Sequence, residues 1–234
     1  MTVPDYSSGR ADMYDSLGIR GTTYEIGFDA VAAVLGDLRG KVLLDFGSGT
    51  GRSAAFLRAL GAELVYGVDH DPAMVRIASA KGLSGVKFLA SDRTIPLPTA
   101  SVAAATSLNV FIEIRSRNVM EEVCTEVARV LQPGGSFVVM STNPEAFGKT
   151  FRTFSYSLPT EPVGGSLATC TVDTVNGPLL IEDTYWQIPD YLGAFTRAGF
   201  DVIDVAYPRP RHPEEWDSDE AVVAPFVIFH LVRA

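Results

Sequence analysis

The chain has 234 residues, of which 47% are hydrophobic and 20% charged, so it can build one sizeable core. Its net charge of -9 opposes binding to a phosphate backbone, and it has no Lys/Arg cluster, so we expect no nucleic-acid partner. Two cysteines far apart, Cys124 and Cys170, favour a reducing compartment over a disulfide scaffold. The N-terminus has no apolar signal segment, and no apolar stretch approaches the roughly 20 residues that span a bilayer, so we expect a cytoplasmic protein without a membrane partner.

The first two thirds of the chain alternate helix and strand patterns. Short continuous apolar runs indicate buried strands, and apolar residues at helical spacing indicate helices between them. This alternation predicts an α/β fold with a doubly wound parallel sheet and helices on both faces. Helices are expected at 23–38 (closed by Gly40), after Arg52, from Asp71-Pro72 and at 116–131, and strands at 42–45, 63–69, 85–90, 102–108 and 136–141.

The pattern breaks after Ser141. Two strand-like runs, 168–175 and 179–188, flank Asn176-Gly177, a strong hairpin signal, although Pro178 shifts the usual register. We expect residues 142–188 to form an inserted β-ribbon that caps a substrate site. Within a single domain of residues 1–234, residues 1–40 are expected to form an N-terminal lid with helices. A helix at 189–198 and strands at 200–207 and 225–232 complete the expected fold.

The most informative stretch is LLDFGSGTGR at residues 43–52, where an apolar strand leads into three alternate glycines and a helix. Gly47, Gly49 and Gly51 permit a tight turn that a ligand can approach closely. Asp45 ends this strand, and Asp69 and Asp92 end the next two. Because parallel sheets bind ligands at the carboxyl ends of their strands, this pattern predicts a nucleotide-type cofactor site.

The glycine spacing bears on which cofactor binds. The dinucleotide fingerprint G-x-G-x-x-G is not met, since Arg52 occupies the place of its last glycine. The turn is not a phosphate-binding P-loop either, because no Gly-Lys-Ser/Thr follows. An acid directly before the turn suits a ligand with an ammonium group better than a pyrophosphate.

With these motifs in order, the chain resembles the class I S-adenosylmethionine (SAM)-dependent methyltransferases of the small-molecule, methyltransferase-11-like type. The resemblance rests on LLDFGSGTGR (43–52), VYGVDHDPAMVRIA (65–78), FLASDRTIPLP (88–98) and RVLQPGGSFVV (129–139). It implies a seven-stranded Rossmann-like sheet of order 3-2-1-4-5-7-6 with an antiparallel last strand, for which PFVIFHLV (225–232) is suited.

The resemblance also implies the cofactor and its site. SAM would bind, and S-adenosylhomocysteine would be the product. Asp45 and the turn at Gly47, Ser48 and Gly49 would hold the methionine end. The remaining expected contacts are Asp69 to the ribose, His70 and Met74 beside ribose and adenine, Asp92 to the adenine amino group, Arg93 at the adenine edge and Asn109 near the methionine moiety.

Residues for catalysis and acceptor binding are less marked. Glu113 could deprotonate a hydroxyl or amine, bind an amine, or be a solvated loop carboxylate. Tyr14 and Tyr24 could cover the methyl group or pack the N-terminus, and Trp186 could wall a substrate pocket or fill the join between ribbon and sheet. No metal site is expected.

We therefore expect a methyltransferase that acts on O, N or C of a small metabolite. A role in natural-product biosynthesis is a hypothesis that rests on the divergent insert. Two alternatives stay open: a protein of the same fold that catalyses another reaction such as cyclisation, and an NAD-dependent oxidoreductase, which Arg52 disfavours. Monomer and homodimer are both compatible with the sequence.

Overall fold

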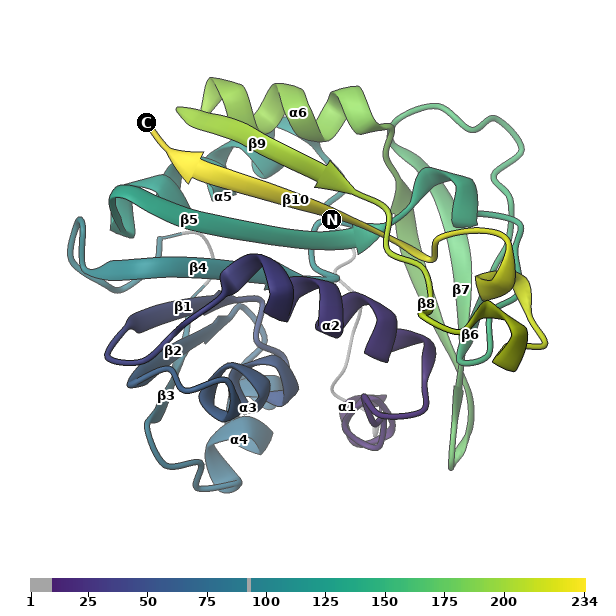
Figure 1. The fold of residues 1–234 in the computed structure, drawn as a ribbon, viewed down its shortest axis with the longest axis horizontal. Helices are drawn as coiled ribbons and strands as arrows, with labels where there is room; N and C mark the ends of the chain where they lie inside the picture. The colour runs from purple at the N-terminus through teal and green to yellow at the C-terminus, as the bar shows by residue number, and fades with distance from the viewer. Residues whose placement is uncertain (1–9, 92–93) are drawn as a thin grey trace.

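The computed structural model describes residues 10–91 and 94–234 and contains one large sheet and one small one (Figure 1). The large sheet has seven strands in the order β3-β2-β1-β4-β5-β10-β9. Its strands are β1 (Val42–Phe46), β2 (Leu64–Asp69), β3 (Val86–Ala90), β4 (Val102–Leu108), β5 (Leu131–Thr142), β9 (Phe200–Ala206) and β10 (Phe226–Arg233).

This sheet has the topology expected from the sequence. The strands β1 to β5 pair in parallel, whereas β10 pairs antiparallel with both β5 and β9. Because β10 is the last of the seven strands along the chain and lies between β5 and β9, the predicted order 3-2-1-4-5-7-6 is confirmed.

Six helices accompany the sheet in the described part of the chain. They are α1 (Arg10–Asp15), α2 (Thr23–Leu35), α3 (Arg52–Ala59), α4 (Pro72–Ala80), α5 (Arg117–Val130) and α6 (Ile188–Arg197). Short 3-10 turns occur at Pro144–Ala146, Pro213–Glu215 and Asp219–Ala221.

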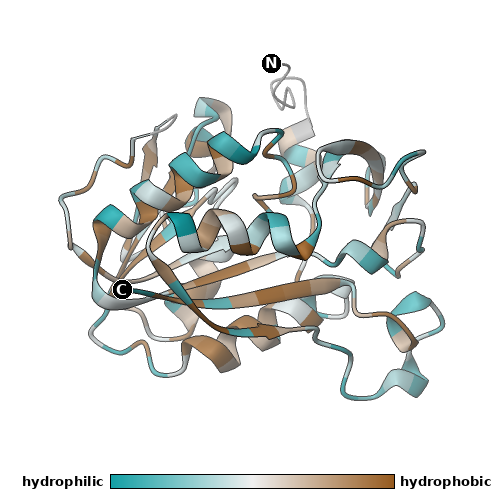
Figure 2. Cartoon of the chain, turned by 90° about the horizontal axis from the view of Figure 1, so that it is seen from above, coloured by the Kyte–Doolittle hydropathy of each residue, from teal (hydrophilic) through white to brown (hydrophobic). Residues whose placement is uncertain are grey.

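Two hydrophobic cores form, one on each face of the sheet. Alternate residues of a strand point to opposite faces, so Leu43 joins the core under α2 and α3 while Leu44 joins the core under α5 and α6. Figure 2 shows the strands mostly brown, with teal turns on the helices along one side of the sheet. Burial on both faces explains why the strands read as continuous apolar runs rather than as alternating patterns.

Some element boundaries differ from the prediction. Helix α2 ends at Leu35 rather than near Gly40, because Gly36 takes a φ of 62° that stops the helix. Helices were expected within residues 1–40, but the bounds of α1 could not be predicted from its polar sequence. Strand β5 begins at Leu131, five residues before the predicted start, because Leu131 already pairs with Val102 of β4 before a register shift leads to the pair of Ser136 and Ala104.

The insert between β5 and α6 is a three-stranded antiparallel sheet rather than a two-stranded ribbon. It consists of β6 (Phe154–Tyr156), β7 (Ser166–Thr174) and β8 (Gly177–Tyr185) in that order. The β7–β8 turn is also shifted from the predicted Asn176-Gly177. Thr174 pairs with Gly177, so Val175 and Asn176 form the loop, and Gly177 begins β8 with a φ of 105°.

Buried polar contacts fix this insert to the start of α2. The Thr23 backbone N–H donates to Thr153 Oγ1 at 2.8 Å, and the Thr153 N–H donates to Thr23 Oγ1 at 3.1 Å. The Thr23 hydroxyl also donates to Glu220 at 2.6 Å, and Glu220 accepts a further bond from the Arg152 N–H. Because Glu220 is fully buried, three segments distant in sequence are tied at one point.

The glycine turn gives a test of the fold. Gly47 has a φ of 72°, and a Cβ built on it would lie 2.2 Å from Val110 Cγ2. Gly21 has almost the same φ, 71°, but open space around it. Gly21→Ala should lower the free energy of unfolding by about 1–2 kcal/mol for the backbone conformation alone. Gly47→Ala should lower it by roughly 2–5 kcal/mol, because overlap with Val110 is added.

Urea unfolding of the two variants and the parent chain measures this difference. Equal losses at the two positions would show that the contact between the turn and Val110 is not a packing constraint.

Candidate active site

The glycine turn is fastened to the end of β2. The N–H groups of Gly47 and Ser48 donate to the Val68 carbonyl at 2.8 and 3.1 Å, and the Gly49 N–H donates to Asp69 Oδ2 at 2.7 Å. Three amides of the turn are therefore already bonded within the protein. The turn is held at the carboxyl end of the neighbouring strand, where a doubly wound sheet binds its ligand.

The positions of the three glycines in the turn are not all glycine for the same physical reason. A Cβ on Gly51 would lie 2.6 Å from the Phe88 ring, and a Cβ on Gly47 would overlap Val110, so packing against protein excludes side chains at both positions. At Gly49 the nearest atom to such a Cβ is a ring carbon of Tyr14 at 3.7 Å. Of the three, Gly49 is therefore the position with space above it for a ligand.

Asp45, expected at the methionine end of the cofactor, lies beneath the turn. Its side chain is fully buried, and its two oxygens accept hydrogen bonds from Ser53 Oγ at 2.5 Å and Thr106 Oγ1 at 3.1 Å. Burial raises the pKa of Asp45 to about 6, although the two hydroxyl donors oppose this rise.

Asp69, expected to bind the ribose, also shapes the turn. It is 8% exposed, and besides the Gly49 amide it accepts the Asp71 N–H through Oδ1 at 2.9 Å. His70 is half-exposed beside it, with Nδ1 3.6 Å from Asp69 Oδ1. Met74 on α4 is buried against Ala11 of α1. The expected partners Asp92 and Arg93 lie outside the residues that the structure describes.

Two buried polar atoms near the glycine turn indicate whether a polar ligand fits there. Ser48 Oγ and Asn109 Oδ1 are buried and have no hydrogen-bond partner within residues 10–91 and 94–234. Asn109 also takes a φ of 59° and is fixed by its N–H, which donates to the Met140 carbonyl at 2.8 Å. Because unpaired buried polar atoms are costly, these residues fit a site whose ligand supplies their partners. Both are residues expected to contact SAM.

Arg52, which breaks the dinucleotide fingerprint, lies among aromatic rings. Its guanidinium carbon is 5.1 Å from the centre of the Tyr14 ring, 4.6 Å from Tyr24 and 5.9 Å from Phe28. It also donates to the Tyr14 hydroxyl and to the Leu17 carbonyl, each at 3.3 Å. Arg52 thus connects the first turn of α3 to α1 and α2 through cation–π contacts and hydrogen bonds.

A small cavity of about 30 Å³ lies between the large sheet, the insert and the N-terminal helices. It brings together four residues selected from the sequence: Tyr14, Tyr24, Asn109 and Glu113. Aromatic and aliphatic side chains form most of the remaining wall. The other lining residues are Ile112, Thr142, Phe154, Tyr156, Cys170, Val172, Ile181, Asp183 and Phe226.

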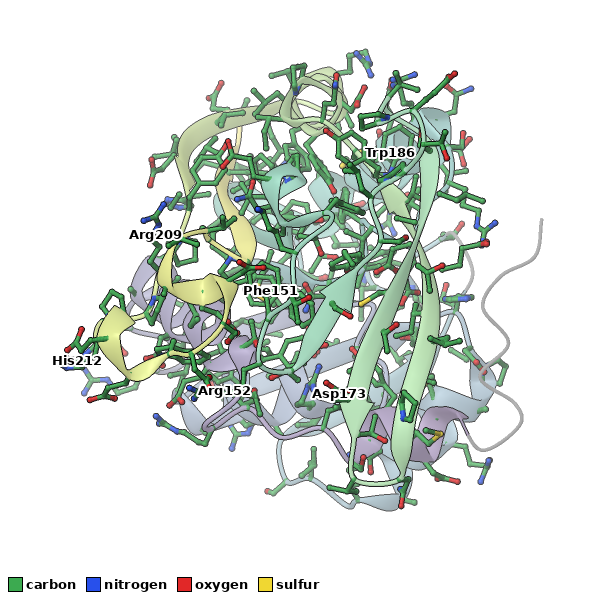
Figure 3. The ribbon with its side chains drawn as sticks, turned by 90° about the vertical axis from the view of Figure 1, so that its right-hand side faces the viewer. Phe151, Arg152, Asp173, Trp186, Arg209 and His212 are labelled. Carbon is green, nitrogen blue, oxygen red and sulfur yellow. The ribbon has the colours of Figure 1, made fainter. Side chains whose placement is uncertain are left out.

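Trp186 does not line this cavity. It is buried in the core under α5 and α6, its indole N–H donates to the Ile114 carbonyl at 2.9 Å, and Arg117 lies over its ring. Figure 3 shows Trp186 near one end of the insert. Trp186 therefore packs where the insert joins the sheet, which was one of the two interpretations of this residue.

Sequence reasoning did not select Asp183, which is the most buried acid of the cavity wall. It is 2% exposed, and its Oδ2 accepts a hydrogen bond from the Tyr156 hydroxyl at 2.6 Å. One signal was present. Leu179, Ile181 and Asp183 recur at every second position of β8, so an acid occupies a position of the stripe that faces inward.

Within residues 10–91 and 94–234, no group of three or more His, Cys, Asp and Glu side chains could hold a metal ion. No helix in the same residues is long and apolar enough to cross a membrane.

The role of Asp69 can be tested by titration with SAM. Asp69→Ala should weaken SAM binding by about 1–3 kcal/mol, because a carboxylate acceptor is lost and the Gly49 amide loses its partner. Asp71→Ala is the matched control. It removes the acid that caps α4 by accepting the Ala73 N–H at 2.7 Å, but it leaves the Asp69 carboxylate in place. Isothermal titration calorimetry measures both, and equal affinities for SAM in the two variants would contradict the assignment.

The raised pKa of Asp45 predicts that the free energy of unfolding depends on pH. Because its folded pKa, about 6, lies above the ordinary value of 3.8, the folded chain holds a proton that the unfolded chain has released. The Asp45 contribution is therefore fully present below 3.8, and the free energy of unfolding falls as the pH rises toward about 6. Asp45→Asn, which can keep both hydroxyl contacts, should reduce this fall by about 3 kcal/mol.

Urea unfolding across this pH range gives the measurement. Burial also raises the pKa of Asp183 to about 7, so the free energy of unfolding of Asp45→Asn still depends on pH to some extent. An unchanged pH profile after Asp45→Asn would contradict the raised pKa.

Known proteins are similar to this chain in sequence and in fold. A family model described as "Methyltransferase domain" matches residues 43–135. N-demethylindolmycin N-methyltransferase of Streptomyces griseus is 26% identical over 73% of this chain and 75% of its own length. Demethylmenaquinone methyltransferase of Thermus thermophilus is 38% identical over 49% of this chain, which spans about half of that relative (54%).

A solved structure has the same fold. The S-adenosylmethionine-dependent methyltransferase from Mesorhizobium loti aligns with a TM-score of 0.67 and 20% identity, over 92% of this chain and 100% of that one. The family model ends inside β5, but the large sheet continues beyond it in the family's strand order to the last antiparallel strand. Residues 43–135 therefore match a methyltransferase domain, and the chain has the fold of solved S-adenosylmethionine-dependent methyltransferases, which supports S-adenosylmethionine as its cofactor.

Proposed function

We propose that this protein transfers the methyl group of SAM to a small, partly apolar metabolite. One observation carries the proposal: the cavity described above adjoins the glycine turn. Tyr14 lines that cavity and also lies next to the space above Gly49. A cofactor held at the turn would therefore have the cavity, and an acceptor in it, within reach.

The cofactor supplies a methyl group that its sulfonium has already activated, so the protein has mainly to position the acceptor and exclude water. We assign the cofactor contacts to Gly49, Ser48, Asp69, His70 and Asn109, on the support of the turn geometry and the unpaired atoms of Ser48 and Asn109. Asp45 would act from below by holding the turn.

The residues of the cavity wall would orient the acceptor. Tyr14 and Tyr24 form its N-terminal side, and Tyr24 stacks on Phe226 with ring centres 6.0 Å apart. Aromatic walls of this kind favour an acceptor with a flat or apolar body. Glu113 supplies a carboxylate to the same wall and is our candidate for contact with the acceptor's polar group.

The names of the two relatives indicate different kinds of methyl acceptor. The name of the Streptomyces griseus enzyme gives an N-methyltransferase, whereas the other relative acts on demethylmenaquinone. We favour nitrogen, because two carboxylates, Glu113 and Asp183, line the cavity and suit an amine better than a quinone. We also propose a role in natural-product biosynthesis. Its support is the insert, which forms its own small sheet over the site and would adapt the fold to an unusual acceptor.

The test is incubation of the protein with SAM and a metabolite extract. We expect S-adenosylhomocysteine to form together with a product that is heavier by one methylene group, measured by mass spectrometry. Gly49→Val is the matched control. It places a branched side chain in the space above the turn, at a φ of 52° that such residues avoid, so it should lose both signals.

Two outcomes would contradict the proposal. A new product without S-adenosylhomocysteine would indicate a reaction such as cyclisation on the same fold. Equal signals from the parent chain and from Gly49→Val would mean that the turn does not hold the cofactor.

A further inference from the structure

Asp183 is held in a defined position at the junction of the insert and the large sheet. Its Oδ2 accepts from the Tyr156 hydroxyl at 2.6 Å, and that hydroxyl also lies 3.0 Å from Thr142 Oγ1 at the end of β5. All three side chains are buried and line the cavity. The orientation of the carboxyl group is thus fixed by residues from β6 and β5.

The second oxygen of Asp183 has no such partner. Asp183 Oδ1 is buried without a hydrogen bond to any residue that the structure describes. A carboxyl group that served only to join the insert to the sheet would have both oxygens satisfied, since an unpaired buried oxygen is costly. One bonded and one unpaired oxygen fit an acid that is oriented by the protein and completed by a ligand.

The surroundings specify the charge of that ligand. The cavity wall carries two carboxyl groups, Glu113 and Asp183, and no Lys, Arg or His among its lining residues in the described ranges. The rings of Tyr24, Phe154 and Phe226 line the same space. Carboxylates together with aromatic faces are the groups that attract an organic cation.

We propose that Asp183, oriented by Tyr156, binds the ammonium group of the methyl acceptor and takes its proton, so that the acceptor is a small amine with an apolar or aromatic body. This inference rests on the proposed methyl transfer and names its substrate class. It also assigns the proton acceptor to Asp183 on the insert, in place of Glu113.

The proposed step transfers one proton and one methyl group. One N–H bond of the ammonium breaks, and its proton goes to the Asp183 carboxylate, which leaves the nitrogen with a free electron pair. That pair forms the new N–C bond while the S–C bond of the cofactor breaks, and the electrons of the S–C bond stay on sulfur in S-adenosylhomocysteine. The product is the N-methylated ammonium ion, and no oxidant or reductant is needed.

Burial supports this role, because it raises the pKa of Asp183 to about 7, against the Tyr156 hydrogen bond and Arg115, which lower it. An acid with a pKa near neutrality is a better proton acceptor than an ordinary carboxylate. Because an ammonium ion binds the ionised form, affinity for an amine should rise with pH through about 7. The titratable and charged groups around Asp183 are Tyr14, Tyr24, Glu113, Arg115, Tyr156, Cys170 and Tyr191.

The test measures binding without the cofactor. The probes are 2-phenylethylamine and its alcohol isostere 2-phenylethanol, titrated calorimetrically into the full chain at several pH values. We expect the parent chain to bind the amine at least about tenfold more tightly than the alcohol, the equivalent of one charge-assisted hydrogen bond. Asp183→Asn should abolish this preference and its pH dependence.

Asp173→Asn is the matched control. It removes the same charge from the same small sheet, but Asp173 is exposed and does not line the cavity (Figure 3). It should keep the amine preference. If Asp183→Asn does not fold, Tyr156→Phe replaces it. Loss of the hydrogen bond that lowers the Asp183 pKa should move the midpoint of amine binding to higher pH.

Two results would overturn the inference: an amine preference that survives Asp183→Asn, or a pH midpoint unmoved by Tyr156→Phe. These results are independent of the proposed function, which is tested by the formation of S-adenosylhomocysteine and by its loss in Gly49→Val. Methyl transfer to an alcohol or a carbon acceptor, with no amine preference in binding, would keep the function and exclude the amine.

Discussion

The hydrogen bond from the Gly49 amide to the Asp69 carboxylate is the contact on which this site depends. It joins the turn after β1 to the end of β2, together with the bonds from the Gly47 and Ser48 amides to the Val68 carbonyl. The same carboxylate accepts the Asp71 amide at the start of α4. A change at Asp69 therefore alters the turn, the helix that follows β2 and the ligand-facing edge of the sheet together.

The insert forms one wall of the cavity. Its three strands lie beside the end of the large sheet where β4 and β5 finish, at the right of Figure 1. The Thr23, Thr153 and Glu220 contacts fix it to α2, and the Thr184 amide donates to the Ile112 carbonyl at 2.6 Å, which fixes β8 to the segment after β4. The insert is thereby held on two sides, and the cavity lies between these attachments. A rigid support of this kind is what a site needs if it is to hold an acceptor in one orientation.

Much of the architecture could be predicted from the sequence, since continuous apolar strands and helical periodicity report on local structure and on burial at once. The strand order rested on the family resemblance and is confirmed. The glycine turn and the position of Asp69 next to it followed from the rule that ligands bind at the carboxyl ends of parallel strands. Asp45 shows the limit of that rule, because the sequence placed it at the same edge but could not show that Ser53 and Thr106 enclose it.

The acceptor side was less predictable for physical reasons. Strand β6 has only three residues, too few for a periodic signal, yet it supplies Tyr156, the partner of Asp183. Helix α1 has six residues of polar sequence, and contacts such as the Asp15–Lys81 ion pair and the packing of Ala11 on Met74 hold it in place rather than its own propensity. The stack of Arg52 on aromatic rings likewise depends on residues from three helices that meet only in the folded chain.

The position of Tyr14 has a thermodynamic consequence. This one side chain borders the space above Gly49, lines the cavity and bonds to Arg52. On the proposed function, the walls of this cavity of about 30 Å³ would have to move apart to admit an acceptor. Any shift of α1 that admits one ligand also reshapes the surface that meets the other. Linkage then requires that each ligand change the affinity for the other by the same factor, so the affinity for one is defined only at a stated concentration of the other.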